Sequence, residues 1–208
     1  MGKVLLINGS PHEHGCTHTA LSEVAESAAK HGLETELLWI GTRPIAGCIA
    51  CGSCIKTGRC IFNEDAVNRI LERLDEYEAI ILGSPVYYAS AAGQLCSFCD
   101  RLFAAGSSRF AGKPGAAVVS CRRGGASAAF DRLNKYFTIA NMPVVSSNYW
   151  NHVHGNTPSE VLQDLEGLQT MRVLGDNLAW LLKNLKAGRE AGNALPEYEP
   201  RIYTNFIR

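Results

Sequence analysis

Four cysteines lie close together in the stretch GCIACGSCIKTGRC, which runs from Gly47 to Cys60. Cys48, Cys51, Cys54 and Cys60 follow the spacing C-x2-C-x2-C-x5-C. Thiols this close together can ligate a metal or a metal cluster, form disulfides, shuttle electrons as a dithiol pair, or pack as small apolar groups. The choice depends on the elements that position this segment and on what else lies at the same edge of the fold.

Bulk composition narrows the class of protein. The chain has 208 residues, which suits one domain, and it is 46% hydrophobic and 19% charged. Its formal net charge is zero, whereas a nucleic-acid-binding protein usually shows a basic surplus. No run approaches the roughly 18 apolar residues of a membrane span. The N-terminal run VLLI is shorter than the roughly 7–15 residues of a signal-peptide core.

We therefore expect a cytoplasmic protein. Thiols stay reduced in that compartment, so clustered cysteines are better explained by metal binding or catalysis than by disulfides.

Strand and helix patterns alternate along the chain. Continuous apolar runs predict buried parallel strands at 3–8, 34–40, 79–84, 115–121 and 143–150. Helical spacing predicts helices at 18–32, 65–78, 94–106, 126–140 and 159–187, the last as one long helix or two shorter ones. This alternation predicts an α/β fold with a five-stranded parallel sheet and helices on both faces. Residues 1–187 would form one domain, and 188–208 a C-terminal tail.

The strand order, flavodoxin-like or Rossmann, is left open by this pattern. The turn after the first strand, NGSPHEHGCTHTA, lacks both G-x-G-x-x-G and G-x-x-x-x-G-K-[ST]. It instead offers hydroxyls and backbone N–H groups at a helix N-terminus, a place that favours a phosphate. His12, His14 and His18 would add partial positive charge. The alternative is that Ser10 and Thr17 are ordinary turn and capping residues.

Two further loops follow strands at the same edge of the sheet. After the third strand, GSPVYYASAAGQL carries Tyr87 and Tyr88, on which a flat aromatic ligand can stack. After the fourth strand, SCRRGGASAAF carries Gly124 and Gly125, which allow a close backbone approach to a ligand. Arg122 or Arg123 would reach an anion, or be merely solvated. A phosphate at the first loop and a flat ring between the other two describe flavin mononucleotide (FMN).

The stretches NGSPHEHGCTHTAL, GSPVYYASAAGQLCSFCDRLF and GKPGAAVVSCRRGG resemble the NADPH-dependent FMN reductase family of flavodoxin-like proteins. The resemblance extends to about residue 186. The family's first loop usually reads G-S-P-R-x-x-G-N-T, and this chain has His12 in place of the arginine and Cys16 in place of the asparagine.

The resemblance implies that the first loop holds the phosphate, that the second contacts the isoalloxazine ring and that the third lines its far side. The predicted cofactor-binding residues are Ser10, His12, Cys16, Thr17, His18, Thr19, Pro85, Val86, Tyr87, Tyr88, Ser120, Arg122, Gly124 and Gly125.

The four clustered cysteines remain to be assigned. Zinc modules usually separate two C-x2-C pairs by roughly 12–20 residues, whereas here all four lie in one loop. Ferredoxins use C-x2-C-x2-C to ligate three corners of an iron–sulfur cube. The segment resembles that of the iron–sulfur flavoproteins, a branch of the same family, which implies that Cys48, Cys51, Cys54 and Cys60 ligate a 4Fe–4S cluster. Free or redox-active thiols remain the alternative. The other cysteines are expected to pack as small apolar groups, including Cys96 and Cys99 of the CSFC stretch.

These observations predict an FMN-dependent NAD(P)H oxidoreductase, in which NAD(P)H gives a hydride to the flavin and electrons pass on, with or without the cluster, to an unidentified acceptor. Such hydride transfer needs no side-chain acid or base, so no catalytic residue is assigned. The alternatives are a flavodoxin-type electron carrier or binding module without NAD(P)H turnover, and a sensor of a phosphate-bearing ligand. A homodimer or homotetramer is expected, with Tyr88, Phe98, Phe103 and the aromatic tail between subunits.

Overall fold

A parallel sheet with helices on both faces forms the centre of the computed structural model, which describes residues 2–204 and 206. The strands are β1 (Lys3–Asn8), β2 (Glu34–Trp39), β3 (Tyr77–Tyr87), β4 (Ser90–Ala91), β5 (Gly115–Cys121) and β6 (His152–His154). The helices are α1 (Cys16–Lys30), α2 (Ser53–Thr57), α3 (Val67–Glu72), α4 (Gly93–Gly106), α5 (Ala126–Ile139), α6 (Pro158–Val161) and α7 (Leu165–Glu190). Short 3-10 helices span Leu74–Glu76 and Ser107–Phe110.

The sheet order is β2-β1-β3-β5-β6, with every neighbouring pair parallel and β4 antiparallel to the end of β3. This is the flavodoxin-like order, so the predicted fold class is confirmed. The chain order reverses between β1 and β3, and ligands of such sheets bind at the carboxyl ends of the strands beside this reversal.

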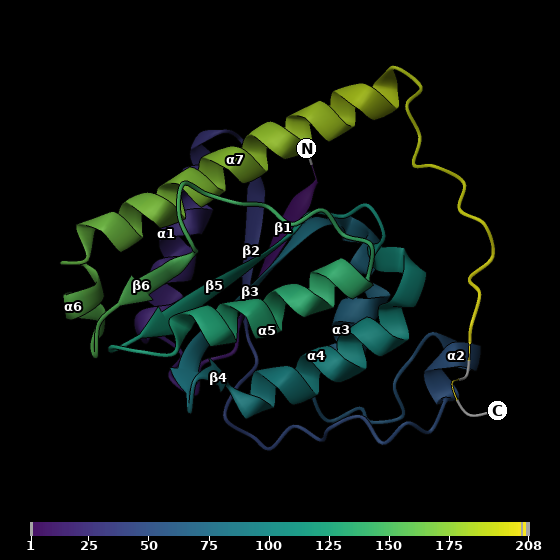
Figure 1. Ribbon diagram of the computed structural model, residues 1–208, viewed down its shortest axis with the longest axis horizontal. Coiled ribbons are helices and arrows are strands. Elements are labelled where there is room, and N and C mark those ends of the chain that lie inside the picture. Colours follow the sequence, from purple (N-terminus) through teal and green to yellow (C-terminus); the bar gives the residue numbers. More distant parts are fainter. Residues whose placement is uncertain (1, 205, 207–208) are drawn as a thin grey trace.

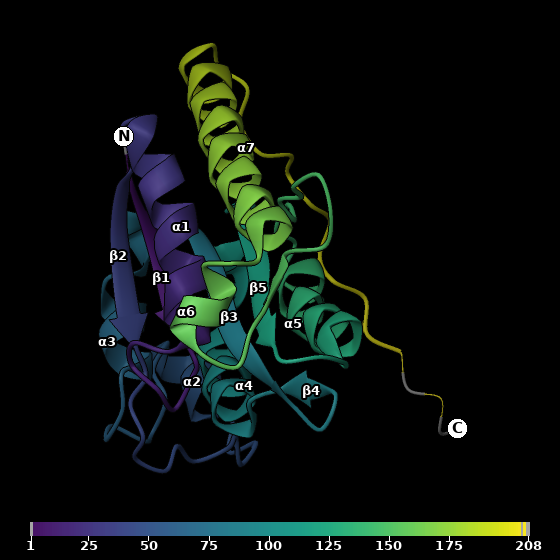
Figure 2. The ribbon, with the colours of Figure 1, turned by 90° about the vertical axis from the view of Figure 1, so that its left-hand side faces the viewer.

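Two apolar layers cover the sheet. Residues of α1 and α7 pack on one face, and residues of α3, α4 and α5 pack on the other. Figure 1 shows α4 and α5 together on one side of the sheet, and Figure 2 shows α1 lying beside α7 on the other. Phe98 is fully buried and Phe103 is 9% exposed, both within this chain's own core. The expectation that these two rings lie between subunits is therefore wrong.

Two predicted elements differ from the structure. The predicted helix 65–78 is divided into α3 and a 3-10 turn, and β3 already begins at Tyr77. The predicted strand 143–150 is wrong, because only Val144 makes an isolated bridge there and the fifth strand of the main sheet is β6. The Ser147 hydroxyl lies within donating distance of the Tyr149 carbonyl and the Asn151 amide oxygen and accepts the Tyr149 N–H, in a local turn that takes the chain away from β5 before it pairs again.

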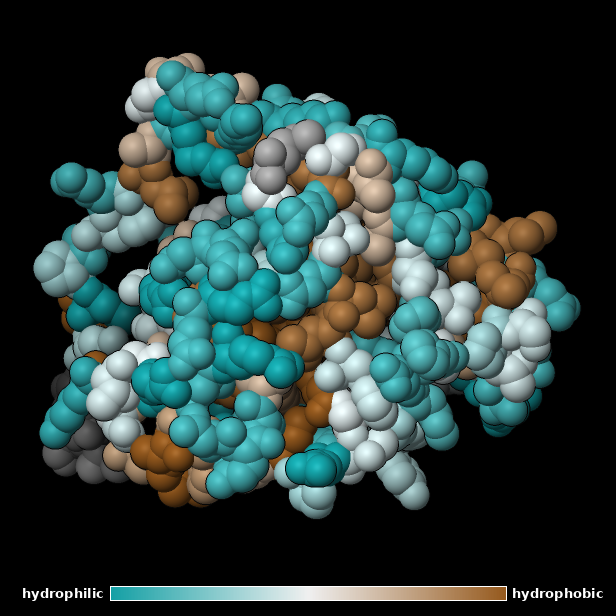
Figure 3. All heavy atoms as spheres, turned by 180° about the vertical axis from the view of Figure 1, so that it is seen from behind, coloured by the Kyte–Doolittle hydropathy of each residue, from teal (hydrophilic) through white to brown (hydrophobic). Residues whose placement is uncertain are grey.

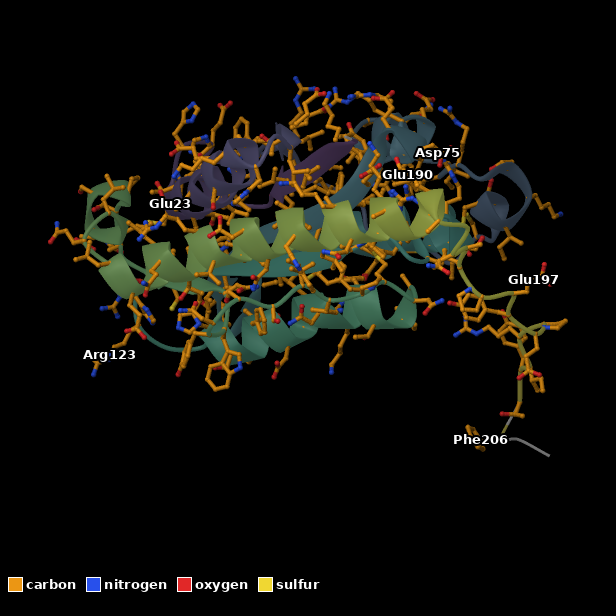
Figure 4. All side chains as sticks on the ribbon, turned by 90° about the horizontal axis from the view of Figure 1, so that it is seen from above. Glu23, Asp75, Arg123, Glu190, Glu197 and Phe206 are labelled. Carbon is orange, nitrogen blue, oxygen red and sulfur yellow. The ribbon has the colours of Figure 1, made fainter. Side chains whose placement is uncertain are left out.

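The C-terminal end of the fold consists of α6, α7 and an extended tail. The predicted helix 159–187 is two helices, and α7 continues to Glu190. Glu197 and Phe206, labelled in Figure 4, lie on the tail away from the body of the molecule. Most of the described tail is exposed, including Tyr198, Tyr203 and Phe206. None of the described helices combines the length and apolarity that crossing a membrane requires.

Candidate functional site

Three loops meet at the carboxyl edge of the sheet, after β1, β3 and β5. Asn8 at the end of β1 lies opposite Gly83 of β3, and Pro85 lies opposite Ser120 of β5. The Gly9 N–H donates to the Gly83 carbonyl at 2.9 Å. The first loop (9–15), the second loop (85–92) and the third loop (122–125) are therefore neighbours, as the parallel sheet predicts.

The first loop is held by its own side chains. The Asn8 amide group donates to the Glu13 carbonyl at 2.9 Å, and its oxygen accepts the Ser10 N–H at 3.0 Å. The Ser10 hydroxyl accepts the His12 N–H, and the Trp39 indole donates to the Ser10 carbonyl. Sequence reasoning missed Asn8 and Trp39, although an asparagine before Gly-Ser-Pro is a typical turn residue. These bonds fix the loop backbone in place.

The loop leads into the N-terminus of α1. Gly15 is the N-cap residue and provides no side chain to accept the N–H groups of the first turn. Those donors and the helix dipole favour an anion there. A Cβ at this position would lie 2.9 Å from the His12 Cβ, so glycine also suits the tight turn.

The two predicted threonines make internal contacts. Thr17 is 1% exposed, and its hydroxyl pairs with that of Ser120 at 2.8 Å. The Thr19 hydroxyl donates to the Gly15 carbonyl at 3.3 Å. Thr17 and Ser120 thus tie the start of α1 to the end of β5, and their predicted contact with the phosphate stays a prediction. The backbone N–H groups of the first turn are the donors best placed for an anion.

His18 and Cys16 are half-buried beside this helix end, and burial shifts the pKa of each. Burial, and then His14, lower the pKa of His18, whose ring lies 4.9 Å from that of His14. This shift favours the neutral imidazole, and the predicted contribution of His18 to phosphate binding stays a prediction. His12 and His14 are exposed. Burial raises the pKa of the Cys16 thiol, which lies 3.7 Å from the Gly155 carbonyl.

The second loop is a tight hairpin between β3 and β4. Tyr88 and Ala89 have φ angles of 50° and 57°, in the left-handed region that residues with side chains rarely adopt. Pro85 and Val86 are half-buried, whereas Tyr87 is 45% exposed and Tyr88 is fully exposed. The hairpin therefore presents both tyrosines at the surface.

The third loop contacts the second. Gly125 has a φ of 92°, and a Cβ on it would lie 2.8 Å from the Ala89 Cα and 3.0 Å from the Val86 Cγ1. Only glycine meets both demands without a shift. Arg122, Arg123 and Gly124 are exposed, and Figure 4 shows Arg123 extending outward at one end of the molecule.

A second site lies farther along α4. All four clustered cysteines line one pocket of about 370 Å³, together with apolar residues and the side chain of Arg101. Cys48 and Cys51 are exposed, and Cys54 and Cys60 are half-buried. Figure 1 shows α2, which carries Cys54, at the opposite end of α4 from β4. The topology therefore brings the four thiols together, as the sequence predicted, at a distance from the second loop.

These residues supply the donor set that an iron–sulfur cluster uses. Across 2–204 and 206, no three His, Cys, Asp or Glu side chains converge closely enough to hold one metal ion. A four-iron cube places its thiolates on separate irons, so its ligands stand farther apart. The pocket offers four thiols and room for a cube, and the Nε–H of Arg101 donates to the Cys60 sulfur at 3.1 Å. Sequence reasoning missed Arg101.

The remaining cysteines are less accessible. Cys99 and Cys121 are buried in the core, and Cys96 is half-buried against it. Burial raises the pKa of the Cys99 thiol well above its ordinary value, so this thiol stays protonated and inert. The expectation that Cys96, Cys99 and Cys121 pack as small apolar groups is confirmed by these positions.

The sequence profile of the NADPH-dependent FMN reductase family matches residues 2–157. The chain belongs to this family. It is 33% identical to an iron-sulfur flavoprotein of Methanocaldococcus jannaschii, over 88% of this chain and 99% of that protein. It is 29% identical to an iron-sulfur flavoprotein of Methanosarcina thermophila, over 90% of this chain and 99% of that protein.

A solved structure supports the fold. The flavodoxin, WrbA-like protein from Agrobacterium tumefaciens has a TM-score of 0.62 and 18% sequence identity, over 88% of this chain and 99% of that one. Family membership makes this chain a flavin oxidoreductase of an FMN-binding family. The flavodoxin-like order predicts that the cofactor binds at the carboxyl edge, where the three loops meet, and this location stays a prediction.

Proposed function

We propose that this protein is an NAD(P)H-dependent FMN oxidoreductase that passes electrons through a 4Fe–4S cluster to an acceptor. Cys48, Cys51, Cys54 and Cys60 hold the cluster. The observation that carries the proposal is that these four thiols, and no others, line a single apolar pocket among the described residues. The names of the two relatives above, both iron-sulfur flavoproteins, support it.

The chain's own groups bind and orient the cofactor. The first-turn N–H groups of α1 hold the phosphate, and the hydrogen bonds of Asn8 to Ser10 and Glu13 fix the loop that leads to them. The second and third loops hold the ring, and Gly125 lets them approach each other. FMN, when bound, would supply hydride acceptance from NAD(P)H and the release of electrons singly or in pairs. The four cysteine thiolates would hold the irons, and the Arg101 N–H donates to one of these sulfurs, that of Cys60.

We also propose that the protein assembles as a homodimer or homotetramer. Tyr88 is fully exposed at the tip of a strained hairpin, and the described aromatic side chains of the tail are exposed as well. Contact with a second copy would bury these surfaces. Light scattering over a range of protein concentrations is expected to give the mass of a dimer or tetramer. A mass of one chain at every concentration would contradict this assembly.

Substitution of one cluster ligand tests the electron path. Serine is a poor ligand for this soft site, so Cys54→Ser is expected to lose iron while keeping FMN. NAD(P)H oxidation with a two-electron acceptor should survive, and transfer to a one-electron acceptor should fall. The matched control is Cys96→Ser, because Cys96 is half-buried on α4 outside the pocket.

Three results would count against the proposal. Equal one-electron rates in Cys54→Ser and Cys96→Ser would reject the cluster as the path. Absence of NAD(P)H oxidation by the FMN-loaded wild type would favour an electron carrier, and a protein that takes up no flavin would favour a sensor of a phosphate-bearing ligand.

A further inference from the structure

A single buried cation lies beside the cysteine pocket. Arg101 is 2% exposed, and each of its five N–H groups has an acceptor. The Nε–H donates to the Cys60 sulfur at 3.1 Å. The two Nη atoms donate to the Ala46 carbonyl at 3.3 Å, to the Phe62 carbonyl at 3.1 Å, and to both carboxylate oxygens of Asp65. The guanidinium also lies 5.1 Å from the centre of the Phe62 ring.

Every one of these acceptors lies within the stretch from Gly47 to Cys60 that carries the four cysteines or within five residues of its ends. Ala46 precedes Cys48 by two residues, and Phe62 follows Cys60 by two. One side chain of α4 thus fixes both ends of the segment to the body of the protein. Between these ends most residues are exposed, including Ile49 and Ile55. Figure 3, which views the molecule from behind, shows apolar atoms that reach the surface between hydrophilic ones.

Cys60 is held at two points. Its backbone N–H and carbonyl bond the side chain of Asn68, which is 4% exposed on α3. Its sulfur is bonded by Arg101 alone among the contacts of the described residues. Asn68 therefore fixes the position of the backbone, whereas Arg101 acts on the sulfur itself.

Arg101 is also the one charged residue among the described residues that line the pocket. A thiolate is a far stronger hydrogen-bond acceptor than a thiol, and an ionised partner strengthens the bond further. Four thiolates around an iron–sulfur cube give it a net negative charge, and one-electron reduction makes that charge larger. Hydrogen bonds to the sulfurs and nearby charge set the reduction potential of such clusters.

We propose that Arg101 is a positioning residue that fixes both ends of the cysteine segment around the cluster and raises the reduction potential of the cluster through its charge and its N–H bond to the Cys60 sulfur. This inference rests on the proposed function, since it requires the cluster. Asp65 opposes the effect, because its carboxylate offsets the charge of the guanidinium. The reaction at issue is the gain of one electron, with no bond formed or broken.

The test uses the full FMN-loaded chain after anaerobic reconstitution with ferrous iron and sulfide. The midpoint potential of the cluster is measured by electron paramagnetic resonance during titration with dithionite. Arg101→Gln removes the charge and is expected to lower the potential. Arg101→Lys keeps the charge without the planar N–H group and should lower it less. Asp65→Asn is expected to raise the potential.

The matched control is Asn68→Ala, which loosens the Cys60 backbone without changing any charge and should leave the potential unchanged. If Arg101→Gln fails to retain iron, the opposite signs expected for Arg101→Lys and Asp65→Asn still decide the matter. If the cluster potentials of Arg101→Lys and Asp65→Asn equal that of the wild type, or shift in the same direction, Arg101 does not set the reduction potential.

Trypsin tests the positioning role in protein without iron. Lys56 and Arg59 are exposed within the segment and provide cleavage sites. Arg101→Gln is expected to speed cleavage at these two sites while cleavage elsewhere is unchanged, and unchanged cleavage would overturn the positioning role. A wild-type protein that takes up no iron would overturn the proposed function and this inference together. If the wild-type protein takes up iron but the midpoint potential of the cluster is unchanged in the Arg101 and Asp65 variants, only the inference is overturned.

Discussion

The N-terminus of α1 offers a sharp test of the phosphate site. Gly15→Asp places a carboxylate at the N-cap, where it accepts the first-turn N–H groups that the phosphate would otherwise use. The backbone suits this change, because Gly15 has φ −85° and ψ −168°, which any residue adopts. The new Cβ would lie 2.9 Å from the His12 Cβ, so the loop backbone must shift slightly to admit any side chain at this position.

The loss of FMN affinity follows from the charges. A phosphate monoester carries about −1.5 to −2 charges at neutral pH. Two unit charges about 4 Å apart repel by about 1 kcal/mol in water and by about 4 kcal/mol at the screening typical of a protein surface. Gly15 is half-buried, so we expect a penalty of about 3–4 kcal/mol, between these limits. At about 1.4 kcal/mol per factor of ten, binding weakens about 100- to 1,000-fold.

The assay is a fluorescence titration of apoprotein with FMN, alongside thermal unfolding of the same apoprotein. Gly15→Asn is the matched control, because it adds a similar side chain, with the same contact to His12, but without the charge. The carboxylate also complements the helix dipole, so the Gly15→Asp apoprotein should unfold at the same temperature as the Gly15→Asn apoprotein or at a slightly higher one. If Gly15→Asp binds FMN as tightly as Gly15→Asn, the phosphate does not lie at this helix end.

Two further predictions concern backbone strain and pH. Gly125→Ala should destabilise the apoprotein by about 1–2 kcal/mol, because φ is 92° and the new Cβ meets the Ala89 backbone. Chemical denaturation measures this loss. The control is Gly124→Ala, whose Cβ meets nothing within 4 Å and which should change the stability little. Burial, and then His154, lower the pKa of His152 below its ordinary 6.5. The unfolded chain therefore binds the proton first, so stability is lost as pH falls below about 6.5. His152→Gln should reduce the slope of unfolding free energy against pH in that range, and an unchanged slope would contradict the assignment.

Much of the fold follows from local patterns. The apolar run GAAVVSC predicts β5 with its observed bounds, because a strand buried on both faces is continuously apolar. The segment 143–150 also has two adjacent valines, and two aromatic residues besides, yet it lies at the edge of the sheet, where one neighbour strand supplies all the pairing. At this edge the local hydrogen bonds of Ser147 are enough to turn the chain away from its pairing with β5.

The site was predictable as a set of loops but not as a set of contacts. Strand order alone places the three loops together, and spacing alone places four cysteines on one segment. The pairing of Thr17 with Ser120 and the contact of Arg101 with Cys60 join residues 103 and 41 positions apart in the chain. No sequence pattern marks such partners. Arg101 also sits in a stretch, CDRLF, that reads as an ordinary helix surface until its burial is seen.

The most direct test of the central claim is the iron and flavin content of wild-type protein, purified without oxygen and reconstituted with ferrous iron and sulfide. The account predicts stoichiometric FMN and about four irons per chain, with both flavin and cluster absorption in the spectrum. Stoichiometric FMN with no iron would contradict it, and the four cysteines would then be a thiol-rich loop of a plain flavin reductase.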